Sequence, residues 1–143
     1  MDSNILDYGG IGHHDGAIEA TLVELNDGRL LKYVRTNWGQ FWRAESVDGG
    51  HYWHTLGPSG VDASSAPGLL FRMASGRIAL LWNRACPEGR SEYTLSGGDR
   101  LWSATPVSNH REEMALAWSE DECDSWSAPV VLQAKRYAKE NRN

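Results

Sequence analysis

The chain has 143 residues, in which 19 aspartates and glutamates outnumber 14 lysines and arginines and give a net charge of −5. Binding to a nucleic-acid backbone depends on clustered positive charge, so this balance argues against a nucleic-acid partner. The sequence shows neither a signal peptide nor an apolar stretch long enough to cross a membrane. We therefore expect no membrane association, and the compartment stays undetermined, with the cytoplasm as the default.

Apolar runs rich in β-branched and aromatic residues, bounded by Gly, Asn or Asp, predict two successive sets of four β-strands. The first set is expected at 18–25, 30–36, 41–46 and 52–56. The second is expected at 68–73, 78–83, 113–119 and 126–132. Each set predicts one four-stranded antiparallel sheet, and the only segment compatible with a helix is the polar tail from residue 133.

An internal repeat closes the third strand of each set. The frame Ser-x-Asp-x-x-x-x-Trp occurs at 46–53 and again at 119–126. An aspartate in such a turn accepts backbone N–H bonds, a glycine supplies a positive φ, and the tryptophan buries its ring. The second copy differs by an insertion at 86–110, whose Gly, Ser and Pro content predicts a loop and not a separate domain.

The repeat resembles the Asp boxes of the sialidase (neuraminidase) superfamily, six-bladed β-propellers that remove terminal sialic acids from glycans. The first box matches in full, with Ser46, Asp48, Gly50 and Trp53. The second has Ser119, Asp121 and Trp126 but carries Cys123 in place of glycine. A left-handed backbone at Cys123 would cost roughly 1 kcal/mol, so we expect a looser second turn.

The resemblance runs over 13–132 and is strongest at 19–36 and 63–70. It implies an all-β fold, a partial sialidase-like β-propeller of about two four-stranded antiparallel blades with Asp-box turns. We interpret the chain as one partial propeller domain, 1–143, divided into a first blade with its lead-in (1–62), a second blade with the inserted loop (63–132) and a polar tail (133–143).

Two blades leave a sheet face exposed on each side, so we expect either a fragment or a homo-oligomer formed through the exposed blade faces. Within the blades, five tryptophans are expected to fill the space between the stacked sheets: Trp42, Trp53, Trp82, Trp118 and Trp126. The two cysteines, Cys86 and Cys123, are expected on opposite ends of the second blade, too far apart for a disulfide.

Strand direction predicts where a site would lie. In antiparallel blades the start of the first strand, the end of the second and the start of the third share one rim, opposite the Asp-box turns. Glu19, Arg35 and Arg111 occupy these positions. Guanidinium groups bind carboxylates through forked, charge-assisted hydrogen bonds, so this rim suits an acidic ligand. The alternative is that Glu19 and Arg35 form a simple ion pair at the end of a hairpin.

The resemblance implies roles for these residues. Glu19 matches the glutamate that assists a tyrosine nucleophile, and Arg35 and Arg111 match the second and third arginines of a carboxylate-binding triad. Trp38 and Asn83 follow second strands and are further substrate-binding candidates, with packing or turn formation as the alternative. A sialic-acid-type or other acidic glycan would be the ligand, and no cofactor is implied.

Other parts of that machinery have no match. The first arginine and the acid/base aspartate are missing, and Tyr137 is not assigned as nucleophile because its surroundings do not resemble a strand start. We therefore expect a catalytically incomplete, sialidase-like glycan-binding piece. The alternative is a non-catalytic, self-associating structural or interaction module. A metal-dependent enzyme using His13, His14 and Asp15 is disfavoured because no further ligands have suitable spacing, and no metal is expected.

Overall fold

The computed structural model describes residues 16–99 and 105–135 and contains two four-stranded antiparallel sheets and one short hairpin. The sheet that we call blade 1 runs in chain order, β1 (Ile18–Glu24), β2 (Leu30–Arg35), β3 (Gln40–Ser46) and β4 (His54–Asp62). Blade 2 has the order β5 (Leu69–Arg72), β6 (Ile78–Trp82), β9 (Glu113–Ser119) and β10 (Val130–Ala134). The described ranges contain no helix, and the predicted all-β partial propeller of two four-stranded blades is confirmed.

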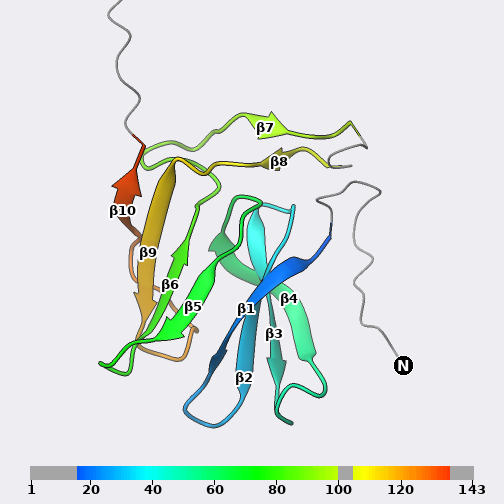
Figure 1. Cartoon of the computed structure of the whole chain (residues 1–143), viewed down its shortest axis with the longest axis vertical. Coiled ribbons are helices and arrows are strands. Elements are labelled where there is room, and N and C mark those ends of the chain that lie inside the picture. The colour runs from blue at the N-terminus through cyan, green and yellow to red at the C-terminus, as the bar shows by residue number, and fades with distance from the viewer. Residues whose placement is uncertain (1–15, 100–104, 136–143) are drawn as a thin grey trace, which may run out of the picture.

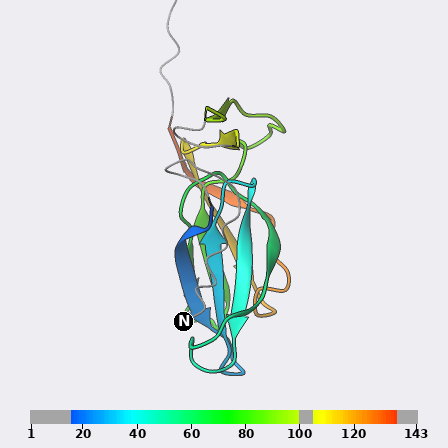
Figure 2. The same cartoon turned by 90° about the vertical axis from the view of Figure 1, so that its right-hand side faces the viewer.

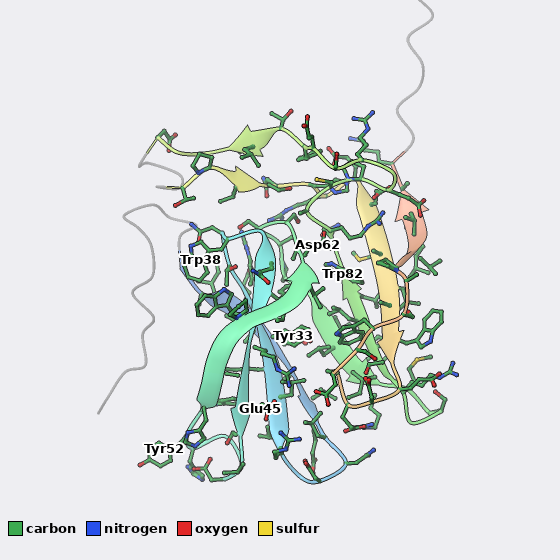
Figure 3. The ribbon with its side chains drawn as sticks, turned by 180° about the vertical axis from the view of Figure 1, so that it is seen from behind. Tyr33, Trp38, Glu45, Tyr52, Asp62 and Trp82 are labelled. Carbon is green, nitrogen blue, oxygen red and sulfur yellow. The ribbon has the colours of Figure 1, made fainter. Side chains whose placement is uncertain are left out.

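The two blades lie side by side and share one hydrophobic core (Figures 1 and 2). Alternate residues of β2, Leu31 and Tyr33, point into this core and are completely buried. Leu80 and Trp82 of β6 enter it from blade 2, and Figure 3 shows Tyr33 and Trp82 between the sheets. Burial of these large side chains is therefore the main contact that holds the blades together.

Two strands differ from their predicted ranges. We expected the fourth strand at 52–56, but β4 covers His54–Asp62 despite its Gly and Pro residues. It lies at the edge of blade 1, where a proline does not interrupt a ladder, and Pro58 pairs with Trp42 between two register shifts. The last strand, expected at 126–132, is β10 at Val130–Ala134. It begins later because Trp126 packs against the core instead of pairing with β9, and its Nε1 donates to the Tyr33 hydroxyl at 3.2 Å.

The expectation for the tryptophans was wrong in part. Trp82 is in the core between the blades and Trp126 packs against it, but the other three are not members of that cluster. Trp42 follows the core residue Phe41 and so faces the other side of blade 1, with its ring centroid 5.0 Å from that of Trp38. Trp53 accepts the Lys32 ammonium over its ring at 4.0 Å.

The inserted stretch 86–110 is not a plain loop. It contains the antiparallel pair β7 (Leu95–Ser96) and β8 (Val107–Ser108), which extends beyond the end of the blades in Figure 1. Each strand has only two residues, too few to show the alternation that identifies a strand in a sequence. The hairpin lies beside the rim that carries the predicted site residues.

Both Asp-box turns form the predicted hydrogen bonds. Ser46 Oγ accepts the N–H of Gly50 at 2.8 Å, and Asp48 accepts that of Tyr52 at 2.9 Å. In the second turn Ser119 Oγ accepts the N–H of Cys123 at 2.9 Å. Cys123 has a φ of 72°, so the predicted left-handed conformation is present. The second turn is not looser than the first. The bonds that Ser46 and Ser119 accept have similar lengths, and Asp121 accepts an additional bond from the Ser125 hydroxyl.

Candidate functional site

The candidate site lies at the end of the blades opposite the Asp-box turns. Here β1 begins, β2 ends and β9 begins, which is the rim that strand direction predicts. A linker, residues 63–68, crosses at this end from β4 of blade 1 to β5 of blade 2. Side chains from both blades can therefore converge on it.

Glu19 reaches this rim through a β-bulge. The β1–β2 register shifts between Ile18 and Ala20, so Glu19 is the extra residue, and its φ of 51° is left-handed. Bulges bend a strand and redirect a side chain, at a cost of about 1–2 kcal/mol for a non-glycine residue. The Glu19 carboxylate forms an ion pair with the Arg35 guanidinium. The Arg35 side chain is 6% exposed and that of Glu19 is 52% exposed, so the carboxylate covers the solvent side of the pair.

Both predicted arginines contact the same linker residue. Arg35 donates from Nε and Nη2 to the Ser65 hydroxyl at 3.2 and 3.1 Å. Arg111, two residues before β9, donates from Nη2 to the Ser65 carbonyl oxygen at 3.0 Å. The structure thus brings Glu19, Arg35 and Arg111 together around Ser65, a residue to which the sequence assigned no role.

Asn83 and Trp38 make structural contacts at this rim. The Asn83 side-chain amide donates to the Glu113 main-chain carbonyl oxygen, and the Asn83 main-chain carbonyl oxygen accepts the Ser64 N–H at 3.0 Å. These bonds join β6, β9 and the linker, as expected for a residue that forms a turn. Trp38 packs on Trp42 and also lines a cleft at the rim.

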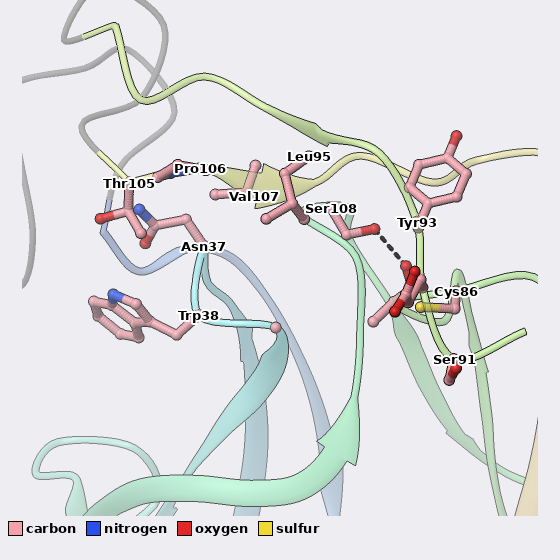
Figure 4. Close-up of a pocket in the computed structure, with 13 residues that line it drawn as sticks. Asn37, Trp38, Cys86, Ser91, Tyr93, Leu95, Thr105, Pro106, Val107 and Ser108 are labelled. Carbon is pink, nitrogen blue, oxygen red and sulfur yellow. Dashed lines mark hydrogen bonds between the residues drawn. The ribbon is translucent and has the colours of Figure 1, made fainter.

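That cleft, of about 630 Å³, lies between blade 1 and the inserted hairpin (Figure 4). Asn37 and Trp38 line it from the loop after β2, and Leu95 and Val107 line it from the hairpin. The sequence did not predict this cleft, because the insertion carries no signal for where it folds back.

A polar cluster at the base of the insertion was also missed. The Tyr93 hydroxyl donates to the Glu112 carboxylate at 2.7 Å and lowers the pKa of that carboxyl. The Tyr93 ring lies 4.9 Å from the ring of His110, which is completely buried. His110 Nδ1 lies 3.2 Å from the Arg84 carbonyl oxygen. These contacts hold the insertion against blade 2. No local sequence pattern predicts them, because the residues are far apart along the chain.

The geometry of this rim does not test several other predictions made from the sequence. Residues 13–15 and Tyr137 lie outside the described residues. Cys86 and Cys123 are both free thiols. Among residues 16–99 and 105–135, no three His, Cys, Asp or Glu side chains gather as metal ligands would. In the same ranges no helix is long and apolar enough to span a membrane.

A family model agrees with the Asp-box pattern. The family model described as BNR repeat-like domain matches residues 1–141. Among solved structures, the Hadza microbial sialidase Hz136 is similar at 20% identity with a TM-score of 0.46. That match covers 85% of this chain and 28% of the sialidase, so the chain spans little more than a quarter of it. No curated protein matches.

Proposed function

The chain belongs to the BNR repeat-like domain family, and from this premise we propose that its rim binds the carboxylate of an acidic, sialic-acid-type glycan. The supporting observation is that two guanidinium groups, one from each blade, contact the same residue, Ser65. A carboxylate has two oxygens that each accept several hydrogen bonds, so paired arginines suit it better than a neutral sugar.

The hydrogen-bond inventory of Arg35 supports this role. A guanidinium carries five N–H groups, and the contacts given above engage its Nε, Nη1 and Nη2 atoms once each. Each Nη carries two N–H groups, so contacts among residues 16–99 and 105–135 leave one donor unused on each Nη, and a bidentate bond to a carboxylate takes one N–H from each. Glu19 lies on the exposed side, where it holds Arg35 and would contact the ligand. The resemblance gives Glu19 the role of the glutamate that assists a tyrosine nucleophile.

We further propose that this chain alone binds the glycan without hydrolysing it. The rim lacks an assigned acid/base and an assigned nucleophile, each of which typically contributes orders of magnitude to the rate. Asp62, at the end of β4 near this rim, accepts the Ala85 N–H at 3.0 Å and so has a structural contact. Sugar recognition would remain, because it needs only the arginines.

Binding of N-acetylneuraminic acid, measured by NMR titration, tests the proposal. Arg111→Ala should weaken binding about tenfold, because it removes one charge-assisted donor from an exposed position. Arg77→Ala is the control, since Arg77 is an exposed arginine in the β5–β6 turn, at the opposite end of the blades. Equal affinities of both variants and wild type would contradict the proposal. So would rapid hydrolysis of a fluorogenic sialoside that survives Glu19→Gln and Arg35→Ala.

The second candidate function is a self-associating structural module. Five large apolar side chains of blade 2 are at least 38% exposed: Leu69, Phe71, Met114, Val130 and Leu132. Contiguous exposed apolar patches of sufficient size mark interaction surfaces in soluble proteins. This candidate does not exclude the first, because the exposed residues lie along the sheet and the arginines lie at its rim.

A further inference from the structure

We propose that Ser65 is the positioning residue of the candidate site: it fixes the Arg35 guanidinium and sets the point around which Arg111 is held. The identity of the ligand rests on the proposed function. The placement of the arginines rests on contacts alone, so the two can be tested separately.

Ser65 contacts each arginine through a different group. Its hydroxyl accepts two N–H bonds from one edge of Arg35, and its carbonyl oxygen accepts one from Arg111. Ser65 is 3% exposed, so these contacts are protected from water. A hydroxyl oxygen has two acceptor lone pairs, which suits the two-pronged contact with Arg35. One small residue therefore joins an arginine of blade 1 to an arginine of blade 2.

The linker is itself held by hydrogen bonds from both blades. Ala63 donates its N–H to Gly39 of blade 1 at 2.9 Å, and Ser64 donates to Asn83 of blade 2 at 3.0 Å. Ser65 donates to Ser108, beside the cleft, at 2.7 Å. Because the backbone is held on three sides, the Ser65 hydroxyl can move only by rotation about χ1, over a much shorter range than the arginine side chain. It therefore provides a nearly fixed acceptor for the guanidinium.

Glu19 alone would not fix Arg35. Its carboxylate is half-exposed and contacts Nη1, so this ion pair is partly screened by water and leaves the Nε edge of the guanidinium without an acceptor. The Ser65 hydroxyl contacts the opposite edge, through Nε and Nη2. Removing this acceptor leaves buried donors without a partner, and the guanidinium must rotate to find another.

The neighbouring residue provides a matched control. Ser64 is 1% exposed, and its hydroxyl oxygen has no hydrogen-bond partner among the described residues. Ser64→Ala and Ser65→Ala therefore remove the same atom from adjacent buried positions. Only the second removes a contact with an arginine.

The test is solvent exchange of the arginine Nε–H protons, followed by NMR on the full chain. In the wild type, Nε–H of Arg35 should exchange at least tenfold more slowly than that of the exposed Arg77. Ser65→Ala should abolish most of this difference, and Ser64→Ala should preserve it. Equal exchange of Arg35 and Arg77 in the wild type would overturn the proposal, and this comparison stands even if Ser65→Ala fails to fold. Unchanged protection in a folded Ser65→Ala variant would overturn it as well.

Titration with N-acetylneuraminic acid then separates this inference from the proposed function. If the wild type binds, Ser65→Ala should weaken binding about tenfold while Ser64→Ala leaves it unchanged, and equal affinities would overturn the positioning role. If the wild type does not bind, the proposed function is wrong, and proton exchange alone decides whether Ser65 positions the arginines.

Discussion

Asp48 and Asp121 stabilise their turns as charged carboxylates. Bonds from the Ser125 hydroxyl and backbone N–H lower the pKa of Asp121 to about 2. The Tyr52 N–H, followed by the Ser46 hydroxyl, lowers the pKa of Asp48. A carboxyl whose pKa is lower in the folded state contributes stability above its unfolded pKa and loses that contribution as the pH falls through its folded pKa.

Acid should therefore weaken the second Asp box between about pH 4 and about pH 2. We expect Asp121→Asn to be less stable than wild type at pH 6. The difference in free energy of unfolding between the two proteins should narrow as the pH falls towards 2, because the variant has no carboxylate to protonate at this site. Urea unfolding at several pH values measures this difference. Asp124→Asn, in the same turn but with a side chain 78% exposed, is the control. A gap that stays constant with pH would contradict the prediction.

The two cysteines should differ sharply in reactivity. Burial raises the pKa of the Cys123 thiol to about 12, and the residue is 2% exposed. Only a thiolate is nucleophilic, so Cys123 should resist alkylation at pH 8 until the protein unfolds. Cys86 lines the cleft and is partly exposed. Mass spectrometry should find one modified thiol in the native chain and two in urea, and native Cys86→Ser should stay unmodified. Rapid double labelling of the native protein would show that Cys123 is accessible.

At the scale of elements, a hydrogen-bonded cluster near the Asp-box end joins the two blades. Arg72 of β5 donates to both Glu122 oxygens at 3.0 and 2.8 Å, and Asn26 of the β1–β2 turn donates to the same carboxylate at 2.8 and 2.9 Å. Glu122 adopts a φ of 59° to reach both partners. One carboxylate therefore connects blade 1, β5 and the second Asp box.

Glu122→Ala should destabilise the protein by about 1–2 kcal/mol, because several charge-assisted hydrogen bonds disappear while partial exposure limits the loss. Glu120→Ala is a matched control, since Glu120 forms a more exposed pair with Arg77 and should contribute less than about 0.5 kcal/mol. Chemical denaturation of both variants gives the comparison. Equal effects would mean that Glu122 does not hold the blades together.

The sequence predicts best those strands whose own residues form an apolar run bounded by turn residues. β9 was predicted at its observed bounds, Glu113–Ser119, because a continuous apolar run with a tryptophan ends there at the second Asp-box frame. Trp126 and Pro58 misled the prediction for physical reasons. Trp126 packs against the core that both blades share instead of continuing a strand, and Pro58 is tolerated because β4 is an edge strand. The rim positions of Glu19 and Arg35 followed from strand direction. The bulge at Glu19, the cleft and Ser65 depend on contacts between distant segments, which no local pattern encodes.

At the scale of the whole molecule, the two blades bury one face of each sheet against the other and leave the opposite faces open. On blade 2, Leu69 and Phe71 of β5 pair with Leu81 and Ala79 of β6 and lie on the face away from the shared core. Leu69 is 52% exposed and Phe71 is 38% exposed. In a closed propeller the next blade would cover a sheet face of this kind. Exposure of these apolar side chains to water therefore costs free energy, which association with a second copy of the chain would recover.

We therefore expect the chain to self-associate through this face. Leu69→Glu and Phe71→Glu together should shift sedimentation towards the monomer, because burying two carboxylates in an apolar contact is unfavourable. Val47→Glu is the control, since Val47 is 69% exposed but lies in an Asp-box turn and not on the sheet face. A wild-type chain that sediments as a well-folded monomer at high micromolar concentration would contradict this expectation. Identical association of the Leu69/Phe71 variant and wild type would place the contact elsewhere.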